Sequence, residues 1–198
     1  MSPSSKTAPR ESYTPVAKLL HWVMAIIWLT AWVLGYLAVN WSDLLNPNFD
    51  IVDAHKALAS TIIFLVVIRV FWRLSHPAPA LPNSISPLLQ RVAHWGHFIL
   101  YAFALIALPL SGWMWSSIVG RPIMMLWIFH LPPLVAPHPE YAHLAKTVHL
   151  TIAWSMGALV LVHILAALKH YFIDRDGVLE SMVPHGHSRA LKNTEKKS

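Results

Sequence analysis

Among the 13 histidines, four lie in long apolar stretches at positions whose spacing relates them to one another. His149 and His163 are 14 residues apart, so in a helix they face the same way and lie about 21 Å apart along the axis. If the apolar stretches cross a membrane, His21 lies at the depth of His163 and His55 at the depth of His149. Two histidine pairs at two depths, each shared by two helices, are the ligand arrangement that two bis-histidine haem groups need.

Other interpretations of these histidines stay open. Any one of them alone is explained as well by hydrogen bonding between helices or by a ring that reaches the membrane interface. A di-iron or di-manganese site is disfavoured because the apolar stretches contain no Asp or Glu. Copper is compatible in principle, although no long Met-rich motif is present, and a proton relay lacks an acidic partner. The matched depth and facing of the whole set favour haem.

Cysteine is absent from the sequence. Disulfides, iron–sulfur clusters and Cys-ligated zinc are therefore excluded, and no thioether can attach a haem covalently. We expect two noncovalent haem b groups, held by axial ligands and packing alone.

Two further residues share the histidine spacing. Gly35 follows His21 by 14 residues, so it lies on the same helix face at the outer depth, where the missing side chain leaves room for a macrocycle. Arg69 follows His55 by 14 residues and lies at the inner depth, where a guanidinium could pair with haem propionates. An ordinary membrane-interface anchor explains Arg69 equally well.

A quinone site is predicted beside the inner pair of histidines. His97 begins the third apolar stretch, and His170 follows His163 by seven residues, about 10 Å further along the same helix face. A histidine can donate both a hydrogen bond and a proton near neutral pH, which quinone reduction requires. The alternative is that both are ordinary interfacial histidines.

The elements that position these residues are four apolar stretches long enough to cross about 30 Å of hydrocarbon, which needs roughly 20 helical residues. They are Leu19–Val39, His55–Trp72, Val92–Ser117 and Thr147–Phe172. The chain is 56% hydrophobic and 12% charged, and that charged share is about half the usual one. We therefore expect an all-α membrane protein, a bundle of four transmembrane helices that forms one dihaem domain over residues 19–172.

The distribution of Lys and Arg predicts the orientation of these spans. With four spans, both termini share a side with 12 of the 15 basic residues, and the opposite side holds Lys56, Arg121 and Lys146. The positive-inside rule then makes the N-terminal segment 1–18 and the basic tail 173–198 cytoplasmic. The longest connection, Ile118–Lys146, contains the apolar run Ile123–Leu131, which is too short to span and is expected in the interface or as a cap on the bundle.

At these positions the chain resembles the bacterial cytochrome b561 family, the small dihaem membrane cytochromes. The resemblance extends from Tyr13 to Val183, and its one departure is Ala59, where a small residue such as Gly is expected. The matching segments are Leu20-His21-Trp22, His55-Lys56, Arg69 to Pro77, Gly96-His97, Leu108 to Trp113, His149 to Trp154 and His163 to Asp176. The resemblance implies that His21, His55, His149 and His163 are the axial ligands. The family includes quinone-linked cytochromes, some similar to superoxide oxidases, and b subunits of hydrogenases and dehydrogenases.

We expect a dihaem b-type cytochrome that passes electrons across a bacterial inner membrane between an outer donor and ubiquinone. Superoxide is a candidate donor, because the three basic residues of the outer side could attract an anion, and the chain would then be a superoxide:ubiquinone oxidoreductase. Two alternatives stay open: a membrane-anchor subunit that takes electrons from a partner hydrogenase or dehydrogenase, and a haem-free transporter or structural membrane protein. The expected partners also include membrane lipid and a redox partner protein. Nucleic acid is not expected as a partner.

Overall fold

The structure is a computed structural model of the 198-residue chain, and it describes residues 12–45, 48, 50–79 and 85–184. Most of these residues are helical, as expected. The segment up to residue 11 and the tail from residue 185 lie outside the described residues. Each of the two predicted cytoplasmic segments, 1–18 and 173–198, is therefore described only in part.

The first half of the chain forms two long helices, α1 (Pro15–Asn40) and α3 (Asp50–Ser75), with the single turn α2 (Ser42–Leu45) between them. α1 begins after Thr14, whose hydroxyl oxygen accepts a hydrogen bond from a backbone N–H of the first turn at 3.3 Å. Proline in that first turn costs no hydrogen bond, because the first N–H groups of a helix have no partner inside it.

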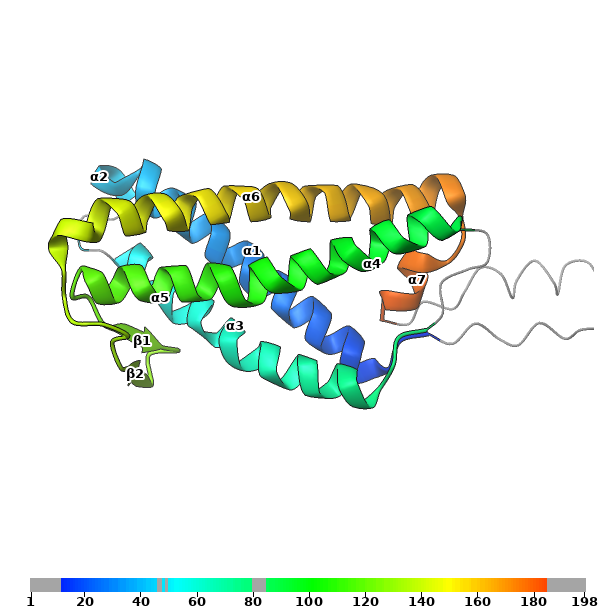
Figure 1. Ribbon diagram of the computed structural model, residues 1–198, viewed down its shortest axis with the longest axis horizontal. Coiled ribbons are helices and arrows are strands. Elements are labelled where there is room, and N and C mark those ends of the chain that lie inside the picture. The colour runs from blue at the N-terminus through cyan, green and yellow to red at the C-terminus, as the bar shows by residue number, and fades with distance from the viewer. Residues whose placement is uncertain (1–11, 46–47, 49, 80–84, 185–198) are drawn as a thin grey trace, which may run out of the picture.

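A third helical rod is built from three segments, α4 (Pro87–Ala102), the π-helical turn η1 (Phe103–Ala107) and α5 (Leu108–Ile118). They follow one another without a break (Figure 1). Pro109 explains the wide turn, because its ring displaces the carbonyl four residues earlier and its nitrogen carries no hydrogen. The predicted third span falls on this divided rod.

The connection after α5 contains a feature that the sequence did not predict. β1 (Ile123–Met125) pairs antiparallel with β2 (Phe129–Leu131), with Met124 opposite His130. The prediction of an all-α protein therefore needs one correction. The apolar run identified in the sequence is a short β-hairpin, which packs against α3.

The second half of the chain ends in a fourth long helix. After the short 3-10 turn η2 (Pro139–Tyr141) comes α6 (Ala142–Lys169), which continues into the π-helical turn η3 (His170–Asp174). The short helix α7 (Val178–Met182) then turns back toward the bundle.

Three helices among the described residues are long and apolar enough to cross a membrane. They are α1, α3 and the helix that runs through α6, over Pro139–Asp174. Each extends beyond the span predicted from hydrophobicity, because a helix can continue past the hydrocarbon into the interface. The remaining crossing, which is the third in chain order and runs over α4 to α5, stays a prediction.

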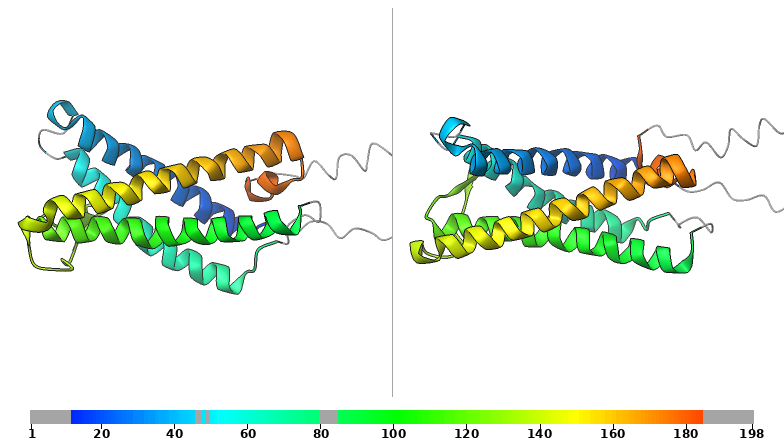
Figure 2. Two further views of the ribbon diagram at one scale, coloured as in Figure 1. Left: turned by 45° about the horizontal axis from the view of Figure 1, so that its top comes forward. Right: turned by 90° about the horizontal axis from the view of Figure 1, so that it is seen from above.

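The two described ends of the chain meet at one end of the bundle. The backbone N–H of Tyr13 donates to the carbonyl oxygen of Ser181 at 3.3 Å. The indole N–H of Trp22 donates to the carbonyl oxygen of Met182 at 3.1 Å. Figure 2 shows that the α1 N-terminus and α7 lie at the same end, opposite to the hairpin. The side of the membrane on which the termini lie stays a prediction.

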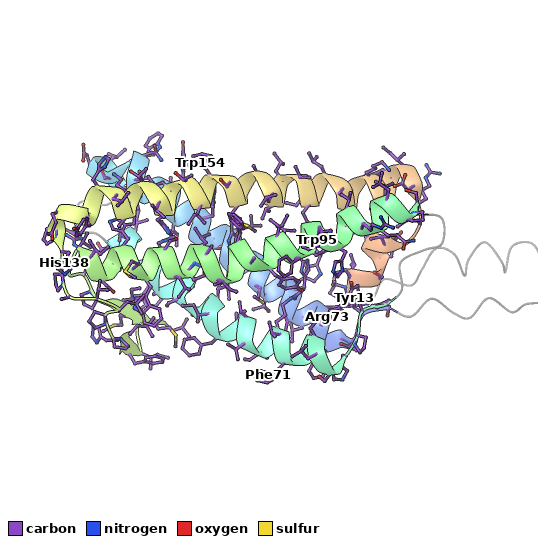
Figure 3. The ribbon with its side chains drawn as sticks, viewed as in Figure 1. Tyr13, Phe71, Arg73, Trp95, His138 and Trp154 are labelled. Atoms are coloured by element: carbon purple, nitrogen blue, oxygen red, sulfur yellow. The ribbon has the colours of Figure 1, made fainter. Side chains whose placement is uncertain are left out.

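The bundle buries little of its apolar surface. Its main core cluster is Met24, Trp28, Ile62 and Met156, contributed by α1, α3 and α6. Large apolar side chains such as Phe71 (70% exposed) and Trp95 (61% exposed) point away from the helices (Figure 3). Exposed apolar surface along whole helices is expected where lipid replaces water as the solvent.

Candidate functional site

The structure brings four histidines together in two pairs. His55 of α3 and His149 of α6 have ring centroids 6.3 Å apart, and we call them the outer pair. His21 of α1 and His163 of α6 have ring centroids 6.4 Å apart and form the inner pair. These are the partners that helix depth predicted from the sequence. α6 contributes one histidine to each pair, 14 residues apart.

The ring spacing fits a metal ion between the two imidazoles of each pair. Metal–nitrogen bonds of about 2.0–2.1 Å on opposite sides of an ion place two ring centroids roughly 6.3 Å apart. The same spacing occurs in both pairs, although the pairs lie at different depths and involve different helices. A direct hydrogen bond between two imidazoles would bring the rings closer together.

Hydrogen bonds at the outer pair orient both rings. His55 donates from Nδ1 to the carbonyl oxygen of Ala31 at 2.6 Å. The hydroxyl group of Ser111 donates its hydrogen to the carbonyl oxygen of Leu108 at 2.8 Å. The hydroxyl oxygen is therefore available to accept the hydrogen on Nδ1 of His149, at 2.9 Å. Both histidines then present Nε2 as the free, unprotonated nitrogen. A neutral histidine fixed in this tautomer is the usual metal-ligating form.

Two glycines make room for the outer rings. A Cβ atom at Gly35 would lie 3.0 Å from Cε1 of His55, and a Cβ at Gly112 would lie 3.0 Å from Cε1 of His149. Gly35 was predicted to make room for a macrocycle, whereas in the structure it admits the imidazole itself. Gly112 has the same role on the other side. Gly112 lies in the segment Leu108 to Trp113, and spacing along one helix does not single it out.

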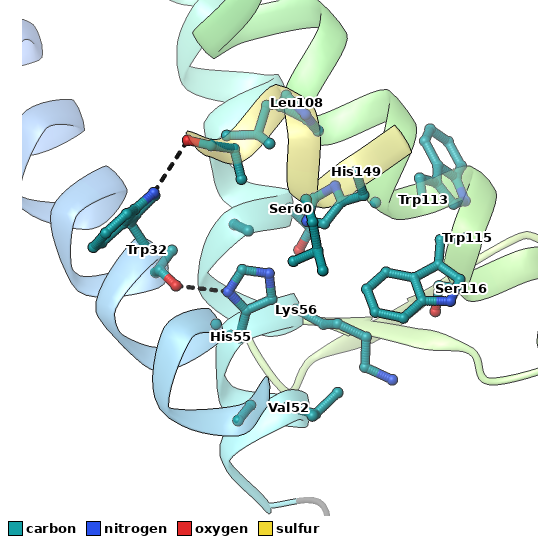
Figure 4. Close-up of a pocket in the computed structure, with 18 of the residues that line it drawn as sticks. Trp32, Val52, His55, Lys56, Ser60, Leu108, Trp113, Trp115, Ser116 and His149 are labelled. Carbon is teal, nitrogen blue, oxygen red and sulfur yellow. Dashed lines mark hydrogen bonds between the residues drawn. The ribbon is translucent and has the colours of Figure 1, made fainter. Parts of the chain in front are cut away.

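A cavity of about 480 Å³ lies at the outer pair. His55 and His149 extend into this space from different helices, and aromatic rings such as Trp115 border it (Figure 4). Its lining is mainly apolar, and Lys56 and Arg121 are its basic residues. Small-molecule sites of this size and polarity hold largely apolar ligands that a few polar groups orient. The cavity therefore fits a large, mainly apolar cofactor with an acidic edge.

The inner pair is accompanied by the partly buried guanidinium of Arg69. Arg69 donates from Nε to the hydroxyl of Tyr101 at 2.9 Å, and its guanidinium carbon lies 5.5 Å from the centre of that ring. The Nη1 atom of Arg69 is buried and has no hydrogen-bond partner in the described part of the chain. A buried donor without an acceptor is costly, so this atom is suited to an anionic group that binds at the inner pair.

The two histidines predicted to bind quinone have different surroundings. The ring of His97 lies 5.4 Å from that of His163, edge to face, so His97 adjoins the inner pair. His170 lies at the end of α6, where its Nδ1 is 2.7 Å from a carboxylate oxygen of Asp176 and 3.3 Å from one of Asp174. Asp174 follows His170 by four residues within η3, and Asp176 comes directly after Arg175, which has a positive φ of 51°.

The chain is similar to known proteins over most of its length. The family model described as prokaryotic cytochrome b561 matches residues 12–185. The chain is 34% identical over 179 residues to cytochrome b561 homolog 2 of Escherichia coli (strain K12), which covers 90% of this chain and 95% of that protein. It is 28% identical over 170 residues to the probable superoxide oxidase CybB of Yersinia pestis, covering 83% of this chain and 92% of that protein. The chain belongs to the prokaryotic cytochrome b561 family of membrane-helical, haem-containing electron-transport proteins.

Proposed function

We propose that the chain binds two noncovalent haem b groups and carries electrons between them across the membrane. His55 and His149 would hold one haem, and His21 and His163 would hold the other. The observation that carries this proposal is the ring spacing of 6.3 Å and 6.4 Å at two depths of one bundle. The family membership supports haem as the group that binds there.

A bound haem supplies an iron that changes its charge by one electron. The chain's own residues set where this happens. The 14-residue spacing on α6 separates the two ligand pairs by about 21 Å along the helix axis, so the two sites lie toward opposite sides of the membrane. Gly35 and Gly112 admit the outer rings, and Arg69 offers a buried donor to a propionate at the inner site.

The electrons would enter at the outer pair, and superoxide is the donor we propose. Each superoxide anion gives up one electron and becomes dioxygen. Lys56 and Arg121 both border the outer cavity, so their positive charge would raise the local concentration of an anion. Lys56 lies 2.9 Å from a carboxylate oxygen of Asp53, which offsets part of its charge. The similarity to a probable superoxide oxidase supports the same donor.

The electrons would leave at the inner pair to ubiquinone, which takes up two electrons and two protons to become a quinol. Two superoxide anions are therefore consumed for each quinone. His97 adjoins the inner pair, and because its Nδ1 donates to the carbonyl oxygen of Ala93 at 2.6 Å, its Nε2 would accept a hydrogen bond from the hydroxyl group of the quinol. His170 is held by two carboxylates, so it would pass protons toward the site from the surface at the end of α6.

We further propose four crossings, with the rod from α4 to α5 as the third. Both termini would be cytoplasmic, as the excess of Lys and Arg on that side indicates, in the inner membrane of a bacterium. The segments 1–18 and 173–198 would flank a dihaem domain over residues 19–172. The inner pair would then lie toward the cytoplasm, where protons for quinone reduction are available.

The test is superoxide-driven quinone reduction by the purified protein in vesicles that contain ubiquinone. Superoxide supplied from the side of the outer pair should reduce the haem and then the quinone. Lys56→Gln should slow this step and make it less sensitive to salt, because the attraction is electrostatic. Lys146→Gln is the matched control, because Lys146 is an exposed basic residue of the same side that does not border the cavity. If superoxide does not reduce the haem, the result would instead favour the alternative that the chain is a membrane-anchor subunit that receives electrons from a partner enzyme.

A further inference from the structure

The β-hairpin between α5 and α6 exposes an unbroken apolar tip. Residues 123–129 carry no polar side chain, and the exposure is largest at the turn itself. Leu126 is 43% exposed, Trp127 57%, Ile128 73% and Phe129 43%. A hairpin turn in water is normally polar, so this composition needs a physical reason.

The backbone of the turn makes the apolar composition more unusual. Leu126 and Trp127 have positive φ angles of 49° and 59°. Hairpin turns of this kind strongly favour Asn, Asp or Gly at both positions, because other side chains are strained there. Large apolar side chains at these two positions are unfavourable unless their surroundings stabilise them. Hydrocarbon is an environment that does so.

Three successive backbone N–H groups at the tip have hydrogen-bond partners inside the protein. Leu126 donates to the carbonyl of Ala57 in α3 at 3.4 Å, and Trp127 donates to Met124 at 3.5 Å. Ile128 donates to Met125 at 2.9 Å. Backbone outside a helix is tolerated at membrane depth only where its polar groups find partners inside the protein. The turn meets this condition for three successive N–H groups.

The hairpin lies along the side of a membrane-spanning helix. The ring of Phe129 packs edge to face on that of Phe64 with centroids 6.4 Å apart. Ala57 and Phe64 are seven and 14 residues inside α3, which is roughly 10 and 20 Å from its start. Phe64 itself is 46% exposed, and Val67 and Ile68 continue the exposed apolar face. The tip is therefore continuous with the surface of α3 that lipid covers.

We propose that the hairpin tip, residues 126–129, is inserted among the acyl chains of the leaflet on the side of the outer pair. Its partner is lipid. The insertion would hold the wall of the outer cavity in place, because Arg121 and Ile123 border that cavity and Lys56 donates to the carbonyl of Pro122 at 3.3 Å. The proposal does not depend on the identity of the electron donor or on the number of haem groups.

Single-cysteine variants test this directly, because the natural chain contains no cysteine. Ile128→Cys places a thiol at the tip, and Glu140→Cys places one on an exposed turn of the same connection. Each variant is reconstituted into phosphatidylcholine–phosphatidylglycerol membranes that are open to solutes on both faces, so the result is independent of orientation. A charged maleimide should label Ile128→Cys at least about tenfold more slowly than Glu140→Cys, because the reactive thiolate forms only in water.

A nitroxide attached to the same thiols separates lipid from protein as the covering medium. At Ile128→Cys the label should collide more with oxygen, which dissolves in acyl chains, than with a water-soluble nickel chelate. Equal maleimide rates at the two positions would overturn the proposal, because the tip would then lie in water and be free to dock a soluble protein. Low accessibility to both oxygen and nickel would also overturn it, because a second protein surface would then cover the tip.

Discussion

The hydroxyl oxygen of Ser111 lies 2.9 Å from Nδ1 of His149 and accepts its hydrogen, while the hydroxyl hydrogen of Ser111 goes to Leu108. This pairing fixes the tautomer of one outer histidine through a side chain. Its partner His55 is fixed by the backbone carbonyl of Ala31, which no substitution removes. Ser111 is therefore the residue at which the orientation of an outer ligand can be altered by mutation.

Ser111→Ala should raise the reduction potential of the outer haem. A hydrogen bond from Nδ1 makes the imidazole a stronger ligand and stabilises the oxidised iron, so its loss favours the reduced form. A lost hydrogen bond of ordinary strength corresponds to a shift of roughly 20–60 mV for a one-electron couple. A spectroelectrochemical titration measures this. Ser60→Ala is the control, because Ser60 borders the same cavity and its hydroxyl donates to the carbonyl oxygen of Ala57, and an equal shift there would contradict the assignment.

Gly35→Ala and Gly112→Ala should each weaken retention of the outer haem and leave the inner haem in place. The added methyl group would lie 3.0 Å from an outer imidazole, so that ring must move. Alanine in a helix is otherwise more favourable than glycine by about 0.5–1 kcal/mol, so helix disruption would not explain a loss. Gly96→Ala is the matched control, because a Cβ there meets nothing within 4 Å. Haem content per chain is measured for all three, and full retention in the first two would show that the glycines do not limit the site.

Arg69→Gln should lower the reduction potential of the inner haem, because a nearby, partly buried positive charge favours the state with the extra electron. Loss of a hydrogen bond to a charged group corresponds to roughly 60–130 mV. Tyr101→Phe keeps the charge and should have a smaller effect. Arg73→Gln, at an exposed position four residues further along α3, should have none. Equal potentials in the variants Arg69→Gln and Arg73→Gln would mean that Arg69 is only an interfacial anchor.

The double substitution His97→Ala, His170→Ala should slow quinone reduction by roughly tenfold or more, the effect of one or two lost hydrogen bonds, while both haem spectra stay intact. Reoxidation of the reduced protein by a short-chain ubiquinone measures this rate. His94→Ala is the control, because His94 is an exposed histidine on α4 near His97. An unchanged rate in the double variant would move the quinone site away from the inner pair.

The depth and partners of the histidines could be predicted from the sequence because two regularities fix them. The rise of an α-helix is constant, and a membrane forces each apolar stretch to start and end near its faces. His149 and His163 on one helix then determine where their partners on α1 and α3 must lie. The structure places the rings of His55 and His21 beside them, at nearly the same spacing in both pairs.

Features that depend on helix rotation or on irregular backbone could not be predicted in this way. Ser111 and Gly112 reach His149 only because α5 turns that face toward α6, which spacing along one helix does not determine. The hairpin was missed because its turn residues, Leu126 and Trp127, are not those that usually signal a turn. The division of the third rod at η1 follows from Pro109, whose effect on a helix varies with its surroundings.

The number of haem groups per chain, in the wild type and in ligand variants, tests the central claim most directly. Haem is extracted into acidified organic solvent, which should remove all of it because no cysteine can form a thioether, and is quantified against protein. We expect two per chain in the wild type, one in His149→Ala, one in His21→Ala and none in the double variant. The haem that remains in the two single variants should differ in spectrum and potential. A wild-type content of one, or loss of the same haem in both single variants, would contradict the account.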